Sequence, residues 1–125
     1  MSGAARRRAY RFGRRAEALC LWSLRLRGYR ILARRFDARV GEIDIVARRD
    51  GLVAFIEVKA RADAADPAAL VTPRQWRRIA RAAGAFLARH DPEGRLSARF
   101  DMMLVRRWRV PRHLRDAWRP PFDGG

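Results

Sequence analysis

The sequence predicts an α/β protein, a single compact domain whose mixed sheet of four to five strands is flanked by helices. Two segments, Tyr10 to Arg27 and Pro73 to Ala88, repeat apolar residues at helical spacing. Residues 41 to 61 instead alternate like two strands joined by a turn, and Ala98 to Val105 alternate in the same way. With Tyr29 to Phe36 as a first strand, the expected order is helix, three strands, helix, then one or two strands.

The N-terminal region is basic, and its first residues offer little to bury. Residues 1 to 9 contain three consecutive arginines, so we expect a flexible basic arm there. An Arg-rich start without acids is also typical of a transit peptide, although a docked helix is the favoured interpretation. Gly28 stands where it would end that helix. Cys20 is the single cysteine and lies on the apolar side, which suggests a packing role in a reduced compartment such as the cytoplasm.

The central hairpin collects charged residues. Asp50-Gly51 suits a tight turn, and with that turn at the centre, paired residues have numbers that sum to 101. Asp44 then lies opposite Glu57, and Glu42 lies opposite Lys59, so three carboxylates and one ammonium are expected on one face. Like charges directly opposite each other destabilise a sheet; a divalent cation, a proton or a neighbouring arginine would relieve them. A one-residue bulge would break this register.

The charge of the chain points to a polyanionic partner. The net charge is +16 and the pI is near 11.8, which favours nucleic acid; the alternative is an Arg-rich composition with solvated surfaces. Of the 29 basic residues only Lys59 is a lysine. Lys59 stands beside Glu57, a position where a compact, titratable ammonium differs most from a delocalised guanidinium.

Glu17 is the only acid among the first 36 residues. Helical spacing places it at the edge of the side that faces the sheet. It would either neutralise an arginine such as Arg14 or supply a further oxygen donor beside the hairpin acids.

The second half of the chain contributes a helix, a strand and an extension. Residues 62 to 70 are small and acidic, and we expect a mobile surface loop. Thr72 precedes Pro73 as an N-cap, and Arg74 with free backbone amides could hold a phosphate. Asp101 is either a site residue or, as we favour, the partner of a nearby arginine. Residues 108 to 125 are expected to form at most a short strand before a loose tail. The arginines expected to contact nucleic acid are Arg14, Arg15, Arg61, Arg74 and Arg77.

Several site classes are excluded. His90 and His113 lie far apart in the sequence without ligand-like neighbours, and one cysteine cannot build a zinc site. The sequence has no glycine-rich phosphate loop, no internal repeat and no apolar run that approaches the ~18 residues of a membrane span.

An acid followed after about a dozen residues by Glu-x-Lys, here Asp44 and Glu57-Val58-Lys59, resembles the signature of the restriction-endonuclease-like (PD-(D/E)xK) superfamily. The surrounding sequence is closer still to the YraN family of uncharacterised bacterial proteins, which look like archaeal Holliday junction resolvases. The matching residues are Ala16-Glu17, Gly28-Tyr29, Gly41-Glu42-Ile43-Asp44, Phe55-Ile56-Glu57-Val58-Lys59 with Arg61, Val71-Thr72-Pro73, and Arg99-Phe100-Asp101. Two positions depart from the family pattern: Arg35 stands where Asn is usual, and Gln75 stands near a usual Lys.

The resemblance implies a three-layer nuclease-like core over residues 10 to 107 and metal-dependent phosphodiester hydrolysis. Asp44, Glu57 and the Val58 carbonyl would bind Mg²⁺ or Mn²⁺, and Glu17 would match the helix acid of the resolvases. Lys59 would orient or deprotonate the attacking water. Glu42 would add a ligand or pair with that lysine.

The leading hypothesis is therefore a metal-dependent endonuclease acting on DNA, including branched DNA. The alternative is a basic nucleic-acid-binding or repair-accessory protein without turnover, because nuclease-like folds also occur in proteins that only bind. An RNA- or ribosome-associated module is a third hypothesis. Chemistry on two strands would call for a twofold homodimer.

Overall fold

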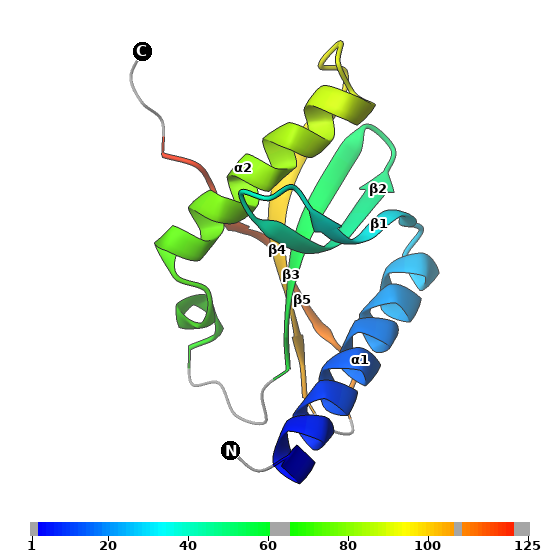
Figure 1. The fold of residues 1–125 in the computed structure, drawn as a ribbon. Coiled ribbons are helices and arrows are strands. Elements are labelled where there is room, and N and C mark those ends of the chain that lie inside the picture. The colour runs from blue at the N-terminus through cyan, green and yellow to red at the C-terminus, as the bar shows by residue number, and fades with distance from the viewer. Residues whose placement is uncertain (1–2, 61–65, 107–108, 122–125) are drawn as a thin grey trace.

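The computed structural model describes residues 3–60, 66–106 and 109–121. Five strands form one sheet, with α1 and α2 on opposite sides of it (Figure 1). The elements are α1 (Gly3–Leu26), β1 (Arg30–Asp37), β2 (Glu42–Arg49), β3 (Leu52–Ala60), the 3-10 helix η1 (Pro67–Leu70), α2 (Pro73–His90), β4 (Ser97–Val105) and β5 (Arg112–Trp118). Strands lie in the order β1-β2-β3-β4-β5; β3 and β4 are parallel and the other pairs are antiparallel. The predicted fold class and element order are confirmed.

Helix α1 is longer than the sequence pattern predicted. It begins at Gly3, so the flexible arm expected over residues 1 to 9 is wrong from Gly3 onward; alanine and arginine both favour helix. Its end is as expected. Gly28 has φ +88°, its N–H is donated to the Arg25 carbonyl, and the N–H of Tyr29 is donated to the Leu24 carbonyl. This is a Schellman motif, which needs a residue that tolerates the left-handed conformation.

The β2–β3 hairpin has the predicted register. Pairs run from Arg49 opposite Leu52 to Ile45 opposite Ile56, all with numbers that sum to 101. Asp50 adopts φ +54° in the turn, a conformation that Asp accepts more readily than most residues. Turn chemistry therefore fixed the pairing of the two central strands.

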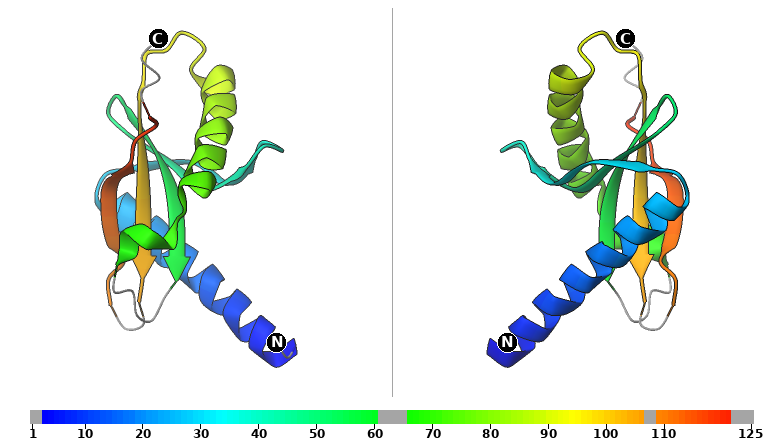
Figure 2. Two further views of the ribbon diagram at one scale, coloured as in Figure 1. Left: turned by 90° about the vertical axis from the view of Figure 1, so that its left-hand side faces the viewer. Right: turned by 90° about the vertical axis from the view of Figure 1, so that its right-hand side faces the viewer.

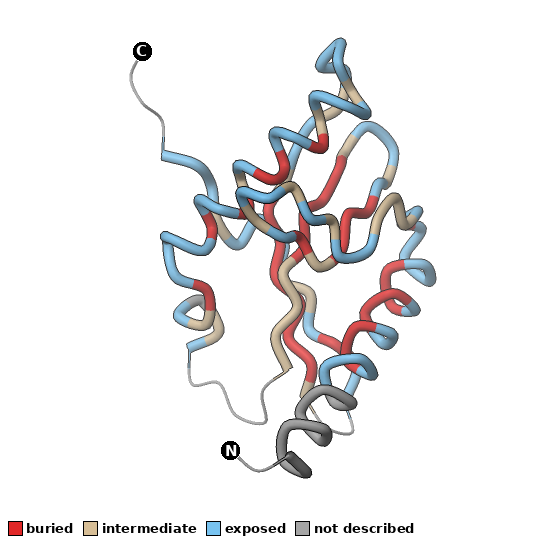
Figure 3. The backbone as a smooth tube through the Cα atoms, in the orientation of Figure 1, coloured by how far each residue is buried: buried red, intermediate tan, exposed pale blue. Residues whose placement is uncertain are grey.

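The two faces of the sheet build two cores. Val46, Val53 and Phe55 pack with α2, whereas Ile45 and Ala54 pack with α1, as the period-two alternation of strands requires. Figure 3 shows this burial in the central strands and along one side of each helix. The cores therefore fix which face each strand residue occupies.

The alternation changes at Asp44. Ile43 packs with α2 although it has the parity of Ile45, which packs with α1. On the neighbouring strand, Arg34 pairs with Ile45 and Phe36 pairs with Ile43, so Arg35 stands opposite Asp44. Arg35 has φ +51°, a left-handed conformation that favours Asn over Arg. The kink here turns the far half of the β1–β2 hairpin toward α2.

The end of the β1–β2 hairpin crosses α2, away from the rest of the sheet (Figures 1 and 2). A Cβ built on Gly41 would lie 2.4 Å from the carbonyl oxygen of Arg78. The two backbones therefore touch, and only a residue without a side chain fits between them. This contact fixes the hairpin end against the second turn of α2.

The C-terminal extension completes the sheet. The expected short strand is β5, which pairs with β4, and Trp118 stacks on Trp76 of α2 with ring centroids 5.8 Å apart. Residues 122–125 of the expected tail and residues 62–65 of the expected mobile loop lie outside the described residues, while Pro67–Leu70 form η1. Within the described ranges, no helix has the length and apolar character needed to cross a membrane.

Gly41→Ala is expected to destabilise the protein by roughly 1–3 kcal/mol, because the new methyl group must displace the α2 backbone. Denaturant unfolding measures this. Gly84→Ala in α2, which has open space around it, is the control and should stabilise by up to about 1 kcal/mol through helix propensity. An unchanged midpoint for Gly41→Ala would show that the hairpin end is not held against α2.

Candidate functional site

The site forms where β2 leaves β3. The last pair of the ladder is Ile45 opposite Ile56, so Asp44 and Glu57, which were predicted to pair directly, lie just beyond it. There Asp44 Oδ2 accepts a 2.8 Å hydrogen bond from the backbone N–H of Val58. The carboxylate thus satisfies a donor that strand separation would leave unpaired. Because the N–H and C=O of a strand residue point to the same side, the Val58 carbonyl is directed into the same gap.

Glu57 and Lys59 stand side by side next to this gap. Their side chains form an ion pair with Nζ 3.6 Å from Oε1 and are only 18% and 22% exposed. The sole lysine was expected beside Glu57 and opposite Glu42; the ion pair that it forms is with Glu57. The two residues are separated by one position on β3, so both point to the α2 side of the sheet.

Burial and mutual repulsion raise the pKa values of both carboxyl groups. Burial raises the pKa of Glu57 to about 7, and the neighbouring Asp44 adds to this against the opposing effect of Lys59. Burial also raises the pKa of Asp44; the Val58 hydrogen bond opposes that rise and the charges of Glu42 and Glu17 reinforce it. A cation bound near the gap would stabilise both carboxylates.

Glu17 is engaged by two arginines of β1. The residue is 8% exposed; its Oε1 accepts from Arg34 at 3.3 Å and its Oε2 accepts from Arg35 Nε at 3.2 Å. Of the two predicted roles, this arrangement fits neutralisation, with Arg34 and Arg35 as partners. Glu17 thereby holds two guanidinium groups beside the strand gap.

The predicted site residues border two hollows on opposite faces of the sheet, so the expectation that they share one face is wrong. On the α1 side, Asp44 and Val58 border a cavity of about 400 Å³ together with Glu17. On the α2 side, Glu42 and Glu57 border a cavity of about 210 Å³. The kink at Asp44 is the physical reason, because it reverses the face that β2 presents.

The donor set fits a small divalent cation. Within residues 3–60, 66–106 and 109–121, no three His, Cys, Asp or Glu side chains converge in the manner of a preformed metal cage. Mg²⁺ does not require one, since it commonly binds one or two carboxylates and completes its shell with water and phosphate oxygens. Asp44 and the Val58 carbonyl on the α1 side of the strand gap, and Glu57 on the α2 side, offer hard oxygen donors of this kind.

The predicted nucleic-acid-binding arginines that the structure describes lie on α1 and α2. Arg14 borders the α1-side cavity, and Arg15, Arg74 and Arg77 are exposed on the two helices. Arg61 lies outside the described residues. The helix start expected to offer free amides is capped: Thr72 Oγ1 accepts from the N–H of Gln75, and Gln75 Oε1 accepts from the N–H of Thr72.

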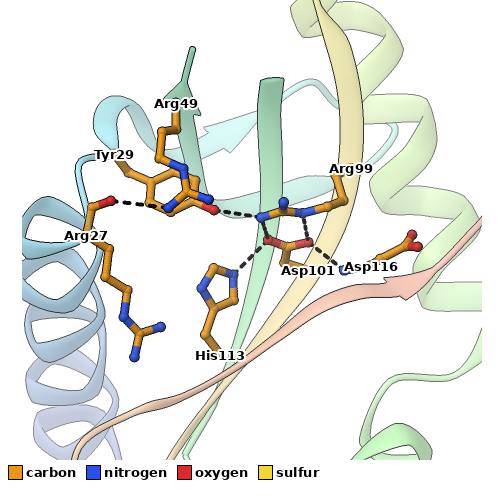
Figure 4. Close-up of polar contacts among 7 residues, drawn as sticks. All are labelled: Arg27, Tyr29, Arg49, Arg99, Asp101, His113 and Asp116. Atoms are coloured by element: carbon orange, nitrogen blue, oxygen red, sulfur yellow. Dashed lines mark hydrogen bonds and ion pairs between the residues drawn. The ribbon is translucent and has the colours of Figure 1, made fainter. Parts of the chain in front are cut away.

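A second buried acid, Asp101, is fully paired. Its two oxygens accept from Arg99 at 2.7 Å each, from the N–H of Asp116 at 2.9 Å, and lie 2.7 Å from His113 Nε2 (Figure 4). Arg99 also donates to the hydroxyl of Tyr29 at 2.8 Å. Burial alone would raise the pKa of Asp101, but the hydrogen bonds from His113, Arg99 and Asp116 outweigh it and the pKa is lowered.

This network confirms the structural ion pair favoured for Asp101 and corrects the expectation for His113. That histidine has a carboxylate neighbour because Met103 pairs with His113 across β4 and β5, which places its side chain on the face of Asp101. No local signal in the sequence gives that long-range register. The arginines Arg34 and Arg78, the latter bordering the α2-side cavity, were also not predicted, since the kinked hairpin alone brings them to the site.

Glu57→Gln should change the pH dependence of stability in the metal-free protein. Because the folded pKa of about 7 lies above the ordinary value of 4.5, the folded state keeps a proton between those pH values that the unfolded chain releases. Stability therefore falls as the pH rises through this window, and the penalty is complete above it. The variant should be more stable than the wild type at pH 8, by about 1–3 kcal/mol, and should gain nothing at pH 4.

Denaturant unfolding in chelator at both pH values measures this effect. Glu93→Gln, which alters an exposed ion pair with Arg95, is the control and should change little at either pH. If the Glu57→Gln variant is no more stable than the wild type at pH 8, the ionised Glu57 carboxylate does not destabilise the folded protein.

Comparison with known proteins places these residues in a family. The chain matches the description "Uncharacterised protein family UPF0102" over residues 16–105, a range that contains both buried acid clusters. It is 51% identical over 114 residues to a UPF0102 protein of Parvibaculum lavamentivorans, covering 90% of this chain and 84% of the relative. A UPF0102 protein of Rhodopseudomonas palustris is 53% identical over 114 residues, covering 91% and 88%, and one of Paramagnetospirillum magneticum is 50% identical over 119 residues, covering 92% of each. The resemblance inferred from the motifs is confirmed, and the chain belongs to the UPF0102 (YraN) family.

Proposed function

We propose that this protein is a metal-dependent endonuclease that hydrolyses phosphodiester bonds of DNA, including branched DNA. The observation that carries the proposal is the grouping of Asp44, Glu57 and Lys59 at the strand gap, where both carboxyl pKa values are raised and Lys59 pairs with Glu57. Perturbed carboxyl groups beside a specific charge partner are typical of catalytic sites.

Each residue has a role that its position supports. Asp44 and Glu57 would hold Mg²⁺ or Mn²⁺ with the Val58 carbonyl, and Glu42 would add negative charge at the edge of the set. A bound metal of this class polarises a phosphoryl oxygen and lowers the pKa of a bound water. Lys59, held 3.6 Å from Glu57, would orient the attacking water or exchange a proton with it.

The positive charge of the chain supports a nucleic-acid substrate. A net charge of +16 attracts a phosphate backbone regardless of its sequence. Arg34 and Arg35, fixed by Glu17, place part of this charge beside the acids. They would counter the repulsion between a phosphodiester and the carboxylates of the site.

A second candidate function is nucleic-acid binding without turnover, as in a repair-accessory protein. Two observations favour it: both oxygens of Glu17 are occupied by arginines, and the acids of the described chain do not form a preformed cage. In this case Asp44 and Glu57 would have only a structural role, and the exposed arginines would bind the nucleic acid.

Cleavage assays separate the two candidates. Four-way, flapped, single-stranded and linear DNA are incubated with the protein in Mg²⁺ or Mn²⁺, and Asp44→Asn and Lys59→Ala should each lower the cleavage rate at least about 100-fold. Cleavage that survives both substitutions would indicate a contaminating nuclease. Thermal melting gives a second readout, because Mg²⁺ should raise the Tm of the wild type but not that of Asp44→Asn. A metal-dependent Tm without cleavage of any substrate would favour the non-catalytic candidate.

The affinity for DNA should fall steeply with salt. Between 50 and 200 mM salt we expect a loss of roughly 10²–10⁴-fold, because each phosphate contact releases counterions. The double variant Arg14→Ala, Arg74→Ala should lower the slope of log Kd against log salt by about two. Arg89→Ala, Arg95→Ala removes the same charge away from the hollows and is the control. A salt-independent Kd would exclude a polyanion as the partner.

A further inference from the structure

The α2-side hollow joins three segments that are distant in sequence. Gly41 and Glu42 come from the hairpin end, Glu57 comes from β3, and Gln75 with Arg78 comes from the first turns of α2. The backbone contact between Gly41 and Arg78 holds the hairpin end and the helix together. The backbone frame of the hollow is therefore set by the fold, and the exposed side chains of Gln75 and Arg78 line it.

Hydrogen bonds at the start of α2 orient the polar group of Gln75. Its Oε1 accepts from the N–H of Thr72 at 2.8 Å, while its own N–H is donated to Thr72 Oγ1 at 3.1 Å. The acceptor of the side-chain amide is thus occupied, and its NH₂ group, a donor only, is the part left to present. Gln75 and Arg78 are three residues apart and lie on the same side of the helix.

The guanidinium of Arg78 has no hydrogen bond or ion pair with another residue in the described part of the chain. This distinguishes it from Arg34 and Arg99, whose guanidinium groups are held by Glu17 and Asp101. Two carboxylates border the same hollow, yet the guanidinium of Arg78 does not pair with either. Its charge is available to an anion that enters from solvent.

The size of the hollow limits the ligand. At about 210 Å³ it is smaller than the ~300–1,000 Å³ typical of sites for whole cofactors or drug-sized ligands. The two donors on α2 suit a single small anionic group with several acceptor oxygens. A guanidinium binds phosphate through two parallel N–H···O bonds, which a point charge cannot do.

We infer that Arg78, with the Gln75 amide as a second donor, binds one backbone phosphate of a nucleic-acid strand on the α2 side of the strand gap. The inference rests on the proposed function and extends it, because it sets the path of the strand. Because the hairpin end and α2 are in backbone contact, the strand runs over the outside of this hollow, and the phosphate held by Arg78 lies on the same side of the sheet as Glu57.

Binding measurements in chelator test this without requiring cleavage. The full chain is titrated against fluorescein-labelled four-way and linear DNA over a series of salt concentrations. Arg78→Ala should weaken binding about tenfold and lower the slope of log Kd against log salt by about one, as the loss of one phosphate contact predicts. Arg78→Lys should keep the slope and bind about threefold more weakly, because it keeps the charge and loses the paired geometry. Arg89→Ala, an exposed arginine in the last turn of the same helix, should stay within about twofold of the wild type.

Two results would overturn the assignment: a Kd and slope for Arg78→Ala equal to those of the wild type, or an equal loss in Arg89→Ala. A fall in Tm that accounts for the weaker binding of Arg78→Ala would assign the residue a structural role and would also overturn it. The same experiments distinguish failure of this phosphate site from failure of the proposed function. DNA binding that depends on Arg78 without cleavage refutes the nuclease alone, whereas wild-type cleavage unchanged in Arg78→Ala refutes the phosphate site alone.

Discussion

The hydrogen bond from the Val58 N–H to the Asp44 carboxylate is the contact on which the arrangement of the site depends. Where β2 leaves β3, the central strand loses its backbone partner, and an unpaired donor in the interior would be costly. A side-chain carboxylate replaces the missing carbonyl. The same bond therefore ends the ladder and fixes an acid in the gap, directly beside the strand that supplies Glu57 and Lys59.

The sheet carries two clusters of acids, and their pKa values shift in opposite directions because their surroundings differ. Asp101 accepts from Arg99, His113 and a backbone N–H, and these partners lower its pKa despite complete burial. Asp44 and Glu57 are half-buried, and burial together with neighbouring negative charges raises their pKa values. The Asp101 cluster links β4 to β5, whereas the carboxyl groups at the strand gap would be stabilised by an added cation.

The kink that creates the gap also distributes the arginines. The left-handed Arg35 faces Asp44 across β1 and β2, and its side chain is held by Glu17 on the α1 side. The same kink turns the hairpin end onto α2, where Gly41 meets Arg78. Positive charge consequently flanks the acids on both faces of the sheet, as a phosphate backbone crossing the gap would require.

The sequence alone determined what depends on local chemistry. The Asp50-Gly51 turn fixed the β2–β3 register, Gly28 ended α1, Thr72 capped α2, and the spacing of Asp44, Glu57 and Lys59 identified the candidate site. The start of α1 was predicted too late because the prediction followed the apolar pattern. That pattern begins after the alanines and arginines that favour helix from Gly3 onward.

Only the tertiary structure decided which residues face one another across the chain. A positive φ at Arg35 has no sequence signal comparable to glycine, so the change of face at Asp44 could not be foreseen. The pairing of β4 with β5, which brings His113 to Asp101, and the contact of Gly41 with Arg78 depend on long-range register and close backbone approach. Local propensities do not encode these, because they are set by how the hairpin, the helices and the sheet pack as a whole.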